Sequence, residues 1–244
     1  MLEASGRKFH AEKTSRNLGI PGALNYAIAH LVNGKYICLM SMDDWLEPDS
    51  IALRMDLFEI SPTVGLVYSS GFFHYEDTGE QVQVRDSYLK EGMIFSDLLK
   101  NNFVFMYGAI IKKEVYDTVG LYDESVTVED WDFSLRASRI YPFAVVRKPL
   151  FHYRKHSSNY SASSTTYYHN VIRIINKYKG EPGYKEGFKW INNVLLNFIF
   201  RNKPRFSSWL YAVRYLRFEK EYLGKLKVYT KALMREKIRI RKSV

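Results

Sequence analysis

The sequence predicts an α/β fold, a sheet covered by helices, followed by a helical C-terminal region. Segments with helical periodicity alternate with short apolar runs of strand character as far as residue 153, which is the pattern of helices packed on a sheet. The 244 residues are 46% hydrophobic and 16% aromatic, enough to form a sizeable core. Strand character ends there, so we place the sheet domain at residues 1–160 and the helical region at residues 161–244.

The first helix is expected from Pro21 to about Val32, where an Asn-Gly pair ends it. Lys35–Met40 has the composition of a short buried strand, and an acidic loop follows it. Further helices are expected at about Pro48–Phe58, Ile94–Leu99, Lys113–Val119 and from Val126–Asp132 to about Ile140, and strands at Val64–Phe73, Val82–Val84, Tyr107–Ile111, Pro142–Val146 and Leu150–Tyr153. Gly79 marks a turn, and Gly120 stops the fourth helix.

Charge divides the chain into two parts. The net charge is +10, but residues 164–244 hold 19 Lys and Arg against 5 Asp and Glu, a net +14, so the rest carries −4. Amphipathic helices are expected in this basic region at roughly Tyr167–Lys179, Tyr184–Phe200, Ser207–Glu221 and Leu223–Ile240. Their apolar faces either pack on the sheet domain or lie on an anionic membrane surface. Charge without a recognised binding module does not predict nucleic acid as a partner.

Cys38 is the only cysteine, and it falls inside the expected strand at residues 35–40. A single cysteine excludes a disulfide framework, so we expect Cys38 to be buried and the protein to reside in a reducing compartment. Met1–Thr14 lacks the apolar core of a signal peptide, and no apolar run approaches the roughly 18 residues of a spanning helix. The sequence therefore predicts a cytoplasmic protein, peripheral at the inner face of the membrane if the basic helices bind lipid.

Two adjacent carboxylates, Asp43 and Asp44, follow the expected strand at residues 35–40. Ligands of open α/β sheets bind outside the carboxyl ends of the strands, where paired carboxylates suit a hard divalent cation together with a phosphorylated ligand. The alternative is a solvated turn in which Asp44 or Asp49 caps the next helix. For an isolated Asp-Asp pair the capping interpretation is favoured, so the choice depends on the other motifs.

Two further groups carry titratable side chains. Asp130 lies where a helix is expected to begin, so it is either an N-cap or a general base presented to an incoming hydroxyl. His156 follows the last expected strand and opens a Ser-rich segment, so it is either a metal ligand or an ordinary solvated histidine. Taken singly, each is better explained by the structural alternative.

The motifs are more informative as an ordered set. In sequence they are Asn17-x-Gly19 with Ala23-x-Asn25, Asp43-Asp44 with Pro48, Gly120-Leu-Tyr-Asp123-Glu124, Glu129-Asp130-Trp131-Asp132 and Tyr153-Arg154-x-His156. Over about residues 15–160 this order resembles the family 2 glycosyltransferases. The resemblance implies a GT-A fold with a Rossmann-like sheet, and inverting transfer of a sugar from a nucleotide diphosphate donor, with Mg²⁺ or Mn²⁺, to a hydroxyl of a glycan or lipid-linked acceptor.

The resemblance also implies roles for single residues. Asp43 matches the metal-binding position of the family's Asp-x-Asp motif, His156 matches a position that in some relatives reaches the metal, and Asp130 matches the catalytic base. Residues expected to contact the donor are Asn17, Gly19, Asn25, Ser41 and Asp44, and those expected to contact the acceptor are Glu129 and Trp131.

The chain departs from the family pattern at two places. Ser41 stands where the family usually has the first Asp of Asp-x-Asp, so a neutral oxygen replaces a carboxylate. Only a short polar segment precedes Asn17, where the family carries a strand-helix-strand unit that holds the nucleotide base. We therefore expect a domain incomplete at its N-terminus, which is a fragment of a longer natural chain, is rearranged, or is completed by a partner chain that supplies the missing unit. The alternative function is a noncatalytic, degenerate domain that binds a partner, a glycan or a membrane.

Overall fold

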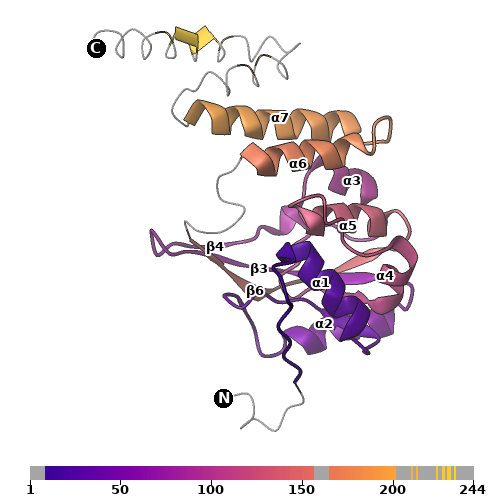
Figure 1. Cartoon of the computed structure of the whole chain (residues 1–244). Coiled ribbons are helices and arrows are strands. Elements are labelled where there is room, and N and C mark those ends of the chain that lie inside the picture. Colours follow the sequence, from indigo (N-terminus) through magenta and orange to yellow (C-terminus); the bar gives the residue numbers. More distant parts are fainter. Residues whose placement is uncertain are drawn as a thin grey trace. The chain divides into compact units, whose positions relative to one another are not determined.

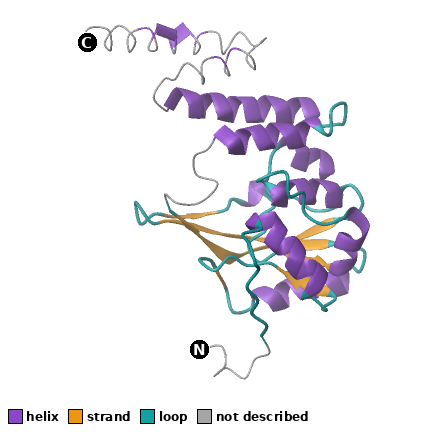
Figure 2. Cartoon of the chain, in the orientation of Figure 1, coloured by secondary structure: helices purple, strands orange, loops and turns teal. Residues whose placement is uncertain are grey.

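A computed structural model describes residues 9–156 and 165–201, together with eight single residues between 210 and 234. The chain forms two compact units, Met1–Asn170 and Val171–Val244. In the first unit, helices lie around a curled sheet (Figures 1 and 2). The predicted α/β class with helices toward the C-terminus is therefore confirmed. The predicted boundary after residue 160 lies outside the described residues.

The elements of the first unit follow the expected order. Its helices are α1 Gly19–His30, α2 Ser50–Ile60, α3 Phe95–Lys100, α4 Lys113–Val119 and α5 Glu129–Ser138, with a 3-10 helix η2 Asp86–Tyr88. Its strands are β1 Tyr36–Cys38, β2 Trp45–Leu46, β3 Leu66–Tyr75, β4 Gln81–Gln83, β5 Ile110–Lys112 and β6 Phe143–Lys155. Every helix expected in this part of the chain is present, and α4 has the expected bounds.

The six strands form one mixed sheet in the order β1-β5-β3-β6-β2, with β4 paired to β3. Only β3 and β6 pair in parallel, whereas β5 runs antiparallel to β1 and β3, and β2 runs antiparallel to β6. β1, β3 and β6 therefore run in one direction and end at the same side of the sheet. This topology brings the loop after β1 close to the segment after β6.

The ladder between β3 and β6 corrects the expected division of residues 142–153 into two strands. Phe143–Lys155 form one strand, whose register against β3 shifts on both sides of the pair Ser70 and Pro149. Proline cannot donate to a ladder, and the bulge accommodates it without ending the strand. An added Cβ at Gly71 would lie 2.4 Å from Cγ of Phe151. Glycine at this position therefore permits the close approach of the two strands.

β1 is shorter and less buried than the sequence predicts. Of its three residues only Ile37 is buried, and Cys38 is exposed. β1 lies at one end of the strand order, so part of its surface stays outside the packed interior. The prediction that Cys38 is buried is therefore wrong, because an apolar run does not distinguish a central strand from an edge strand.

The inner face of α2 packs on β3, β5 and β6. Phe58 belongs to the core, whereas Ile51, on the same helix, is 44% exposed. Arg54 is fully buried instead, and its guanidinium donates to the hydroxyls of Ser50 and Ser69. Burial lowers the pKa of Arg54 to about 10. The core under α2 thus contains a cation that neutral oxygens solvate.

The helices expected after residue 160 are partly described. α6 Thr165–Asn176 begins in the first unit and continues into the second, where α7 Tyr184–Arg201 follows. Both fall where amphipathic helices are predicted, and Ile174, Ile175 and Ile191 are fully buried. Within the described residues, no helix has the length and apolar character needed to cross a membrane. The helices expected at 207–221 and 223–240 lie almost entirely outside the described residues.

Candidate active site

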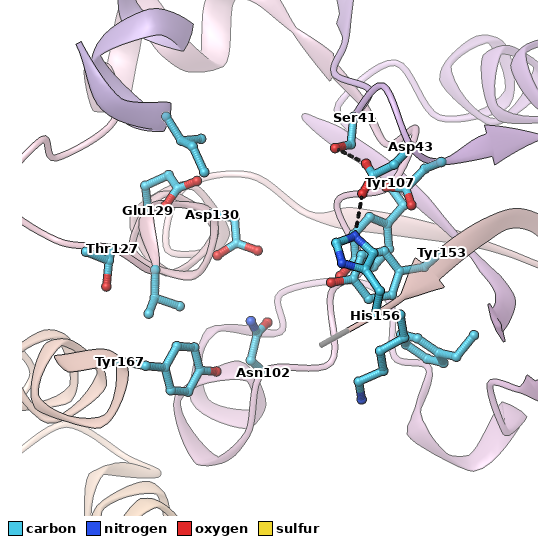
Figure 3. Close-up of a pocket in the computed structure, with 15 residues that line it drawn as sticks. Ser41, Asp43, Asn102, Tyr107, Thr127, Glu129, Asp130, Tyr153, His156 and Tyr167 are labelled. Carbon is cyan, nitrogen blue, oxygen red and sulfur yellow. Dashed lines mark hydrogen bonds and ion pairs between the residues drawn. The ribbon is translucent and has the colours of Figure 1, made fainter. Parts of the chain in front are cut away.

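A pocket of about 540 Å³ lies in the first unit, where β1 and β6 end and α5 begins. Two of its walls face each other (Figure 3). Asp43 and His156 lie on one wall, Glu129 and Asp130 lie on the other, and Asn102 lies between them (Figure 3). The structure therefore brings together the acidic loop, the helix start and the histidine that the sequence singled out.

Asp43 and His156 meet although 113 positions separate them in the sequence. The pairing of β2 with β6, together with a 3.0 Å hydrogen bond from the backbone N of Arg154 to Asp44, fixes the acidic loop against β6. Asp43 Oδ2 lies 3.3 Å from His156 Nε2, and Asp43 Oδ1 accepts a 2.6 Å hydrogen bond from Ser41. These two contacts hold the pKa of Asp43 below its ordinary value, so its carboxylate is ionised at neutral pH.

The chemistry of this wall fits part of a divalent-cation site. Asp44 lines the pocket, and among the described residues its buried Oδ2 has no hydrogen-bond partner. Burial also raises the pKa of Asp44, and this effect exceeds the opposite effect of its hydrogen bond from Arg154 N. The described part of the chain holds no group of three or more His, Cys, Asp or Glu side chains suited to a metal. Mg²⁺ is commonly held by one or two carboxylates and ligand phosphates, so Asp43, with His156, fits such a shared site.

The opposite wall carries two carboxyl groups with raised pKa values. Asp130 lies in the first turn of α5, whose N-cap is Val128, so the N-cap interpretation is wrong. Its Oδ1 accepts a 2.7 Å hydrogen bond from the backbone N of Trp131. Burial raises the pKa of Asp130, and burial with the charge of Asp130 raises the pKa of Glu129 to about 7. Carboxyl groups tuned in this way at a pocket wall suit proton transfer.

Trp131 does not line this pocket wall. Its side chain is fully buried, and its Nε1 donates a 3.0 Å hydrogen bond to the backbone oxygen of Leu98 in α3. The predicted contact between Trp131 and an acceptor therefore finds no support in its position. Trp131 instead anchors α5 to α3 and so positions the neighbouring Asp130.

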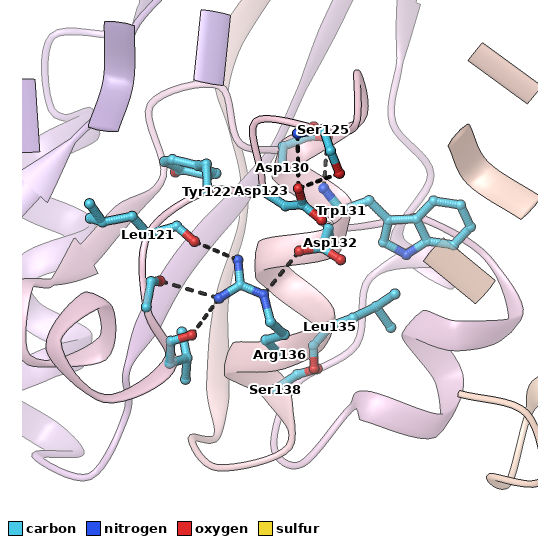
Figure 4. A network of polar contacts seen from close by, with 12 residues as sticks. Leu121, Tyr122, Asp123, Ser125, Asp130, Trp131, Asp132, Leu135, Arg136 and Ser138 are labelled. Carbon is cyan, nitrogen blue, oxygen red and sulfur yellow. Dashed lines mark hydrogen bonds and ion pairs between the residues drawn. The ribbon is translucent and has the colours of Figure 1, made fainter. Parts of the chain in front are cut away.

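Arg136 fixes α5 to the loop after α4 (Figure 4). Its Nε donates to Oδ2 of the fully buried Asp132 at 2.9 Å. Its other nitrogens donate to the backbone oxygens of Val119, Gly120 and Leu121 at distances between 2.5 and 3.2 Å. The motif that begins at Gly120, where φ is +82°, is therefore held against the helix that carries Asp130.

Asn25 supports the same loop. Its amide bonds to both the backbone N and O of Tyr122, at 2.9 and 3.0 Å, and to Glu124 Oε1 at 3.0 Å. These contacts occupy Asn25 and tie α1 to the loop, so the structure gives no support to a donor contact. The sequence pattern of α1 alone does not reveal this partner.

Asn17 and Gly19 lie closer to the candidate site. Asn17 Oδ1 accepts a 2.8 Å hydrogen bond from the backbone N of Gly19, and both residues line a neighbouring pocket of about 490 Å³. Glu129 lines both pockets, and Glu124 lines this one. The two carboxyl groups do not favour a phosphate beside the start of α1 unless they are protonated.

Sequence analysis missed the aromatic side of the pocket. Tyr107 and Tyr153 stack with their ring centroids 4.3 Å apart, and both line the pocket. Burial, Tyr153 and Asp130 raise the pKa of Tyr107 well above its ordinary value, so it is a neutral donor. The sequence places Tyr107 in an expected strand at Tyr107–Ile111, but in the structure strand β5 begins only at Ile110. Tyr153 belongs to a recognised motif, but nothing in its sequence context indicates a stacking partner.

Three comparisons relate this chain to known proteins. Residues 2–120 match the model of the family described as Glycosyl transferase family 2. Chondroitin synthase of Escherichia coli is 24% identical over 179 residues, which are 71% of this chain and 25% of that protein. The chain thus spans a quarter of the length of this curated relative.

Two solved structures are also similar to this chain. S. aureus TarS 1–349 in complex with UDP-GlcNAc has a TM-score of 0.49 and 12% identity, covering 84% of this chain and 58% of that one. The mannosyltransferase PcManGT from Pyrobaculum calidifontis, in complex with GDP-Man and Mn²⁺, has a TM-score of 0.49 and 16% identity, covering 91% of this chain and 66% of that one.

Proposed function

We propose that this chain is a member of glycosyl transferase family 2, whose model matches residues 2–120, and that its first unit transfers a sugar, with inversion, from a nucleotide diphosphate donor to a hydroxyl of a glycan or lipid-linked acceptor. One observation carries this proposal. Asp130 lies on the wall opposite Asp43 and His156 (Figure 3). An inverting displacement needs the base and the departing diphosphate on opposite sides of the reacting carbon.

Asp130 is the proposed general base. As the acceptor oxygen bonds to the sugar carbon and the bond to the diphosphate breaks, the hydroxyl proton passes to the Asp130 carboxylate. The raised pKa of Asp130 supports this role, because a weaker acid has a conjugate base that binds a proton more strongly. Glu129, beside it, is proposed to orient the acceptor hydroxyl.

Asp43 and His156 are proposed to hold Mg²⁺ or Mn²⁺ with oxygens of the donor diphosphate. When bound, the cation would neutralise the charge that develops on the diphosphate leaving group. Ser41 donates to Asp43, so it keeps the carboxylate oriented even though it replaces a family carboxylate. The buried Oδ2 of Asp44 has no hydrogen-bond partner among the described residues, so it is available to a ligand or to a water bound with it at this wall.

Replacement of Asp43 by alanine should weaken Mn²⁺-dependent nucleotide binding by at least about tenfold, because it removes the ionised ligand. Calorimetric titration of the purified chain with UDP and with GDP, each with and without Mn²⁺, measures this effect. Asp56→Ala provides the control, since Asp56 is an exposed acid of α2 outside the pocket lining. An equal response to Mn²⁺ in both variants would remove the metal role of Asp43. Absence of binding by the wild-type chain would favour the noncatalytic alternative.

The pH profile gives a second test of the proposed base. The base works only when deprotonated, so its raised pKa should place the acidic limb of kcat/KM above the ordinary aspartate value of about 3.9. Activity is expected to rise with pH across that limb. Glu129→Gln should leave the limb in place, because Asp130 is already ionised when Glu129, whose pKa is about 7, loses its proton. A limb at the ordinary value, or one that shifts in Glu129→Gln, would contradict the assignment.

Two other parts of the sequence-based interpretation stay predictions. Association of residues 164–244 with an anionic membrane rests on charge, and much of that region lies outside the described residues. A partner chain that completes the nucleotide site is likewise untested. Both add to the proposed transfer reaction without being required for the roles of Asp43 and Asp130.

A further inference from the structure

A second pocket of about 430 Å³, here called the side pocket, adjoins the candidate active site. Phe73 and Asn102 line both pockets. The side pocket is otherwise formed by the β3–β4 hairpin, η2 and the segment after α3. The two pockets therefore meet at Phe73 and Asn102.

The lining of the side pocket combines aromatic rings with amides. Its aromatic residues are Phe73, Tyr75, Tyr88, Phe103 and Phe105. Phe73 and Phe105 pack edge to face with their centroids 5.6 Å apart, which fixes the ring at the junction with the candidate active site. A pyranose ring presents C–H groups on its faces, which suit aromatic surfaces, and hydroxyls at its edge, which suit amides.

Asn102 supplies a polar group at the junction of the two pockets. Its Oδ1 is buried and has no hydrogen-bond partner among the described residues. Leaving a buried acceptor unpaired is unfavourable, so this atom is suited to a donor brought by a ligand. A sugar hydroxyl is such a donor, whereas a purely apolar ligand would leave the atom unpaired.

The charged residues in and beside the side pocket indicate the charge of the ligand that it suits. Arg85 lines it, and none of the described residues that line it is an aspartate or glutamate. Lys155 lines the candidate active site, and its Nζ atom lies 4.9 Å from the ring centroid of Tyr75 and 5.8 Å from that of Phe73, two rings of the side pocket. The Arg85 cation in the lining and the Lys155 cation beside these rings favour a ligand that carries negative charge.

We propose that the side pocket binds a sugar unit of the acceptor glycan, and that it prefers units carrying a carboxylate. This inference rests on the proposed glycosyl transfer, and it places a further sugar unit of the acceptor on a surface distinct from the walls that hold Asp43 and Asp130. In the proposed complex the sugar ring stacks on the aromatic side chains of the side pocket. The amides of Asn101 and Asn102 form hydrogen bonds with the sugar hydroxyls, and Arg85 pairs with the carboxylate.

Saturation-transfer NMR on the full chain tests this binding without requiring turnover. The probes are two neutral hexasaccharides, of maltose and cellulose type, and two carboxylated ones, an oligogalacturonate and a hyaluronan fragment. Saturation of aromatic protein protons is expected to reach the sugar protons, most strongly for the carboxylated probes. Absence of transfer to all four probes, or stronger binding of the neutral pair, would overturn the proposal.

Two variants locate the site. Tyr88→Ala should weaken binding of the carboxylated probes by about fivefold, because it removes one exposed aromatic ring from the lining of the side pocket. Arg85→Gln should reduce the preference for carboxylated over neutral probes. Phe9→Ala is the matched control, since Phe9 is 49% exposed, Tyr88 is 51% exposed, and Phe9 lines neither pocket. Equal binding by all three variants would contradict the side-pocket assignment.

Calorimetry with UDP or GDP and Mn²⁺ separates this inference from the proposed function. Tyr88→Ala and Arg85→Gln should bind nucleotide like the wild type, because neither residue lines the candidate active site. Weaker glycan binding by Tyr88→Ala and a reduced carboxylate preference in Arg85→Gln, both with intact nucleotide binding, would support the side pocket. A wild-type chain that binds glycan but neither nucleotide would leave the side pocket standing and contradict the transferase proposal.

Discussion

Replacement of Asp130 by asparagine is expected to lower kcat by about 10²- to 10⁴-fold, the contribution typical of a general base. Asparagine keeps the shape of the side chain and an oxygen for the 2.7 Å hydrogen bond from Trp131 N, but it cannot take a proton. Donor affinity should stay nearly unchanged, because Asp130 lies across the pocket from Asp43 (Figure 3). Steady-state kinetics and nucleotide calorimetry on the same preparation measure both quantities.

The same variant should not lose stability. Burial raises the pKa of Asp130 in the folded chain above its unfolded value, so folding favours the protonated form. At a pH above the folded pKa the ionised carboxylate therefore destabilises the fold, and a neutral amide does not. The Tm of Asp130→Asn at pH 7 should equal or exceed the wild-type value. The difference should vanish below about pH 4, where the carboxyl is protonated in both states.

Glu129→Gln is the matched control for the base assignment. Glu129 is adjacent, lines the same pocket and also has a raised pKa, about 7. We expect this variant to retain most turnover while its affinity for the acceptor falls. If Glu129→Gln abolished turnover and Asp130→Asn did not, the base would be Glu129 and the proposed role of Asp130 would be wrong.

Replacement of Arg136 by alanine is expected to lower the free energy of unfolding by about 3–5 kcal/mol, as for other broken buried ion pairs. Asp132 is fully buried, and Arg136 is its cationic partner at 2.9 Å. The substitution also removes the donors to the carbonyls of residues 119, 120 and 121 (Figure 4). Urea unfolding followed by circular dichroism measures the loss.

Arg147→Ala is the control for this prediction. The Arg147 side chain is 47% exposed, and its contacts with Asp86 and Glu91 are 3.9 Å long, so its ion pairs contribute little. Its effect should stay within about 0.5 kcal/mol. Equal unfolding midpoints for the two variants would contradict a stabilising role of Arg136. A replacement of both Arg136 and Asp132 by apolar residues should recover part of the loss, because the buried Asp132 carboxylate is then removed together with its cationic partner.

Local sequence patterns predicted much of the fold. α4 has the expected bounds because Lys113–Val119 combines helical periodicity with a glycine stop at Gly120, which adopts a positive φ. Both signals lie within a few residues of each other, and neither depends on a distant partner. The ordered motifs likewise indicated a resemblance to glycosyl transferase family 2, whose model matches residues 2–120. They also named Asp43, Asp130 and His156, which the structure places around one pocket.

Features that depend on strand order could not be predicted in this way. The segment Lys35–Met40 is largely apolar, but only the order of strands in the sheet shows that β1 is an edge strand. Cys38, at the end of β1, is exposed. Asn25 matched a donor-site motif, yet its amide bonds to a loop 97 positions away. Trp131 looked available beside Asp130, but the approach of α3 buries it. A residue's local pattern constrains its backbone, whereas its burial and partners depend on what packs against it.

The linear pattern of residues was enough to predict the α/β class, the order of most elements and the carboxylates and histidine of the candidate site. Which of these residues meet depends on how distant segments pack. The parallel course of β1, β3 and β6, with β2 pairing β6, brings Asp43 to His156 across 113 positions. The tertiary structure also forms the side pocket and places between the pockets the Asn102 oxygen, for which the described part of the chain offers no hydrogen-bond partner. Periodicity and propensity act over a few neighbouring residues, while a pocket forms where segments distant in sequence converge.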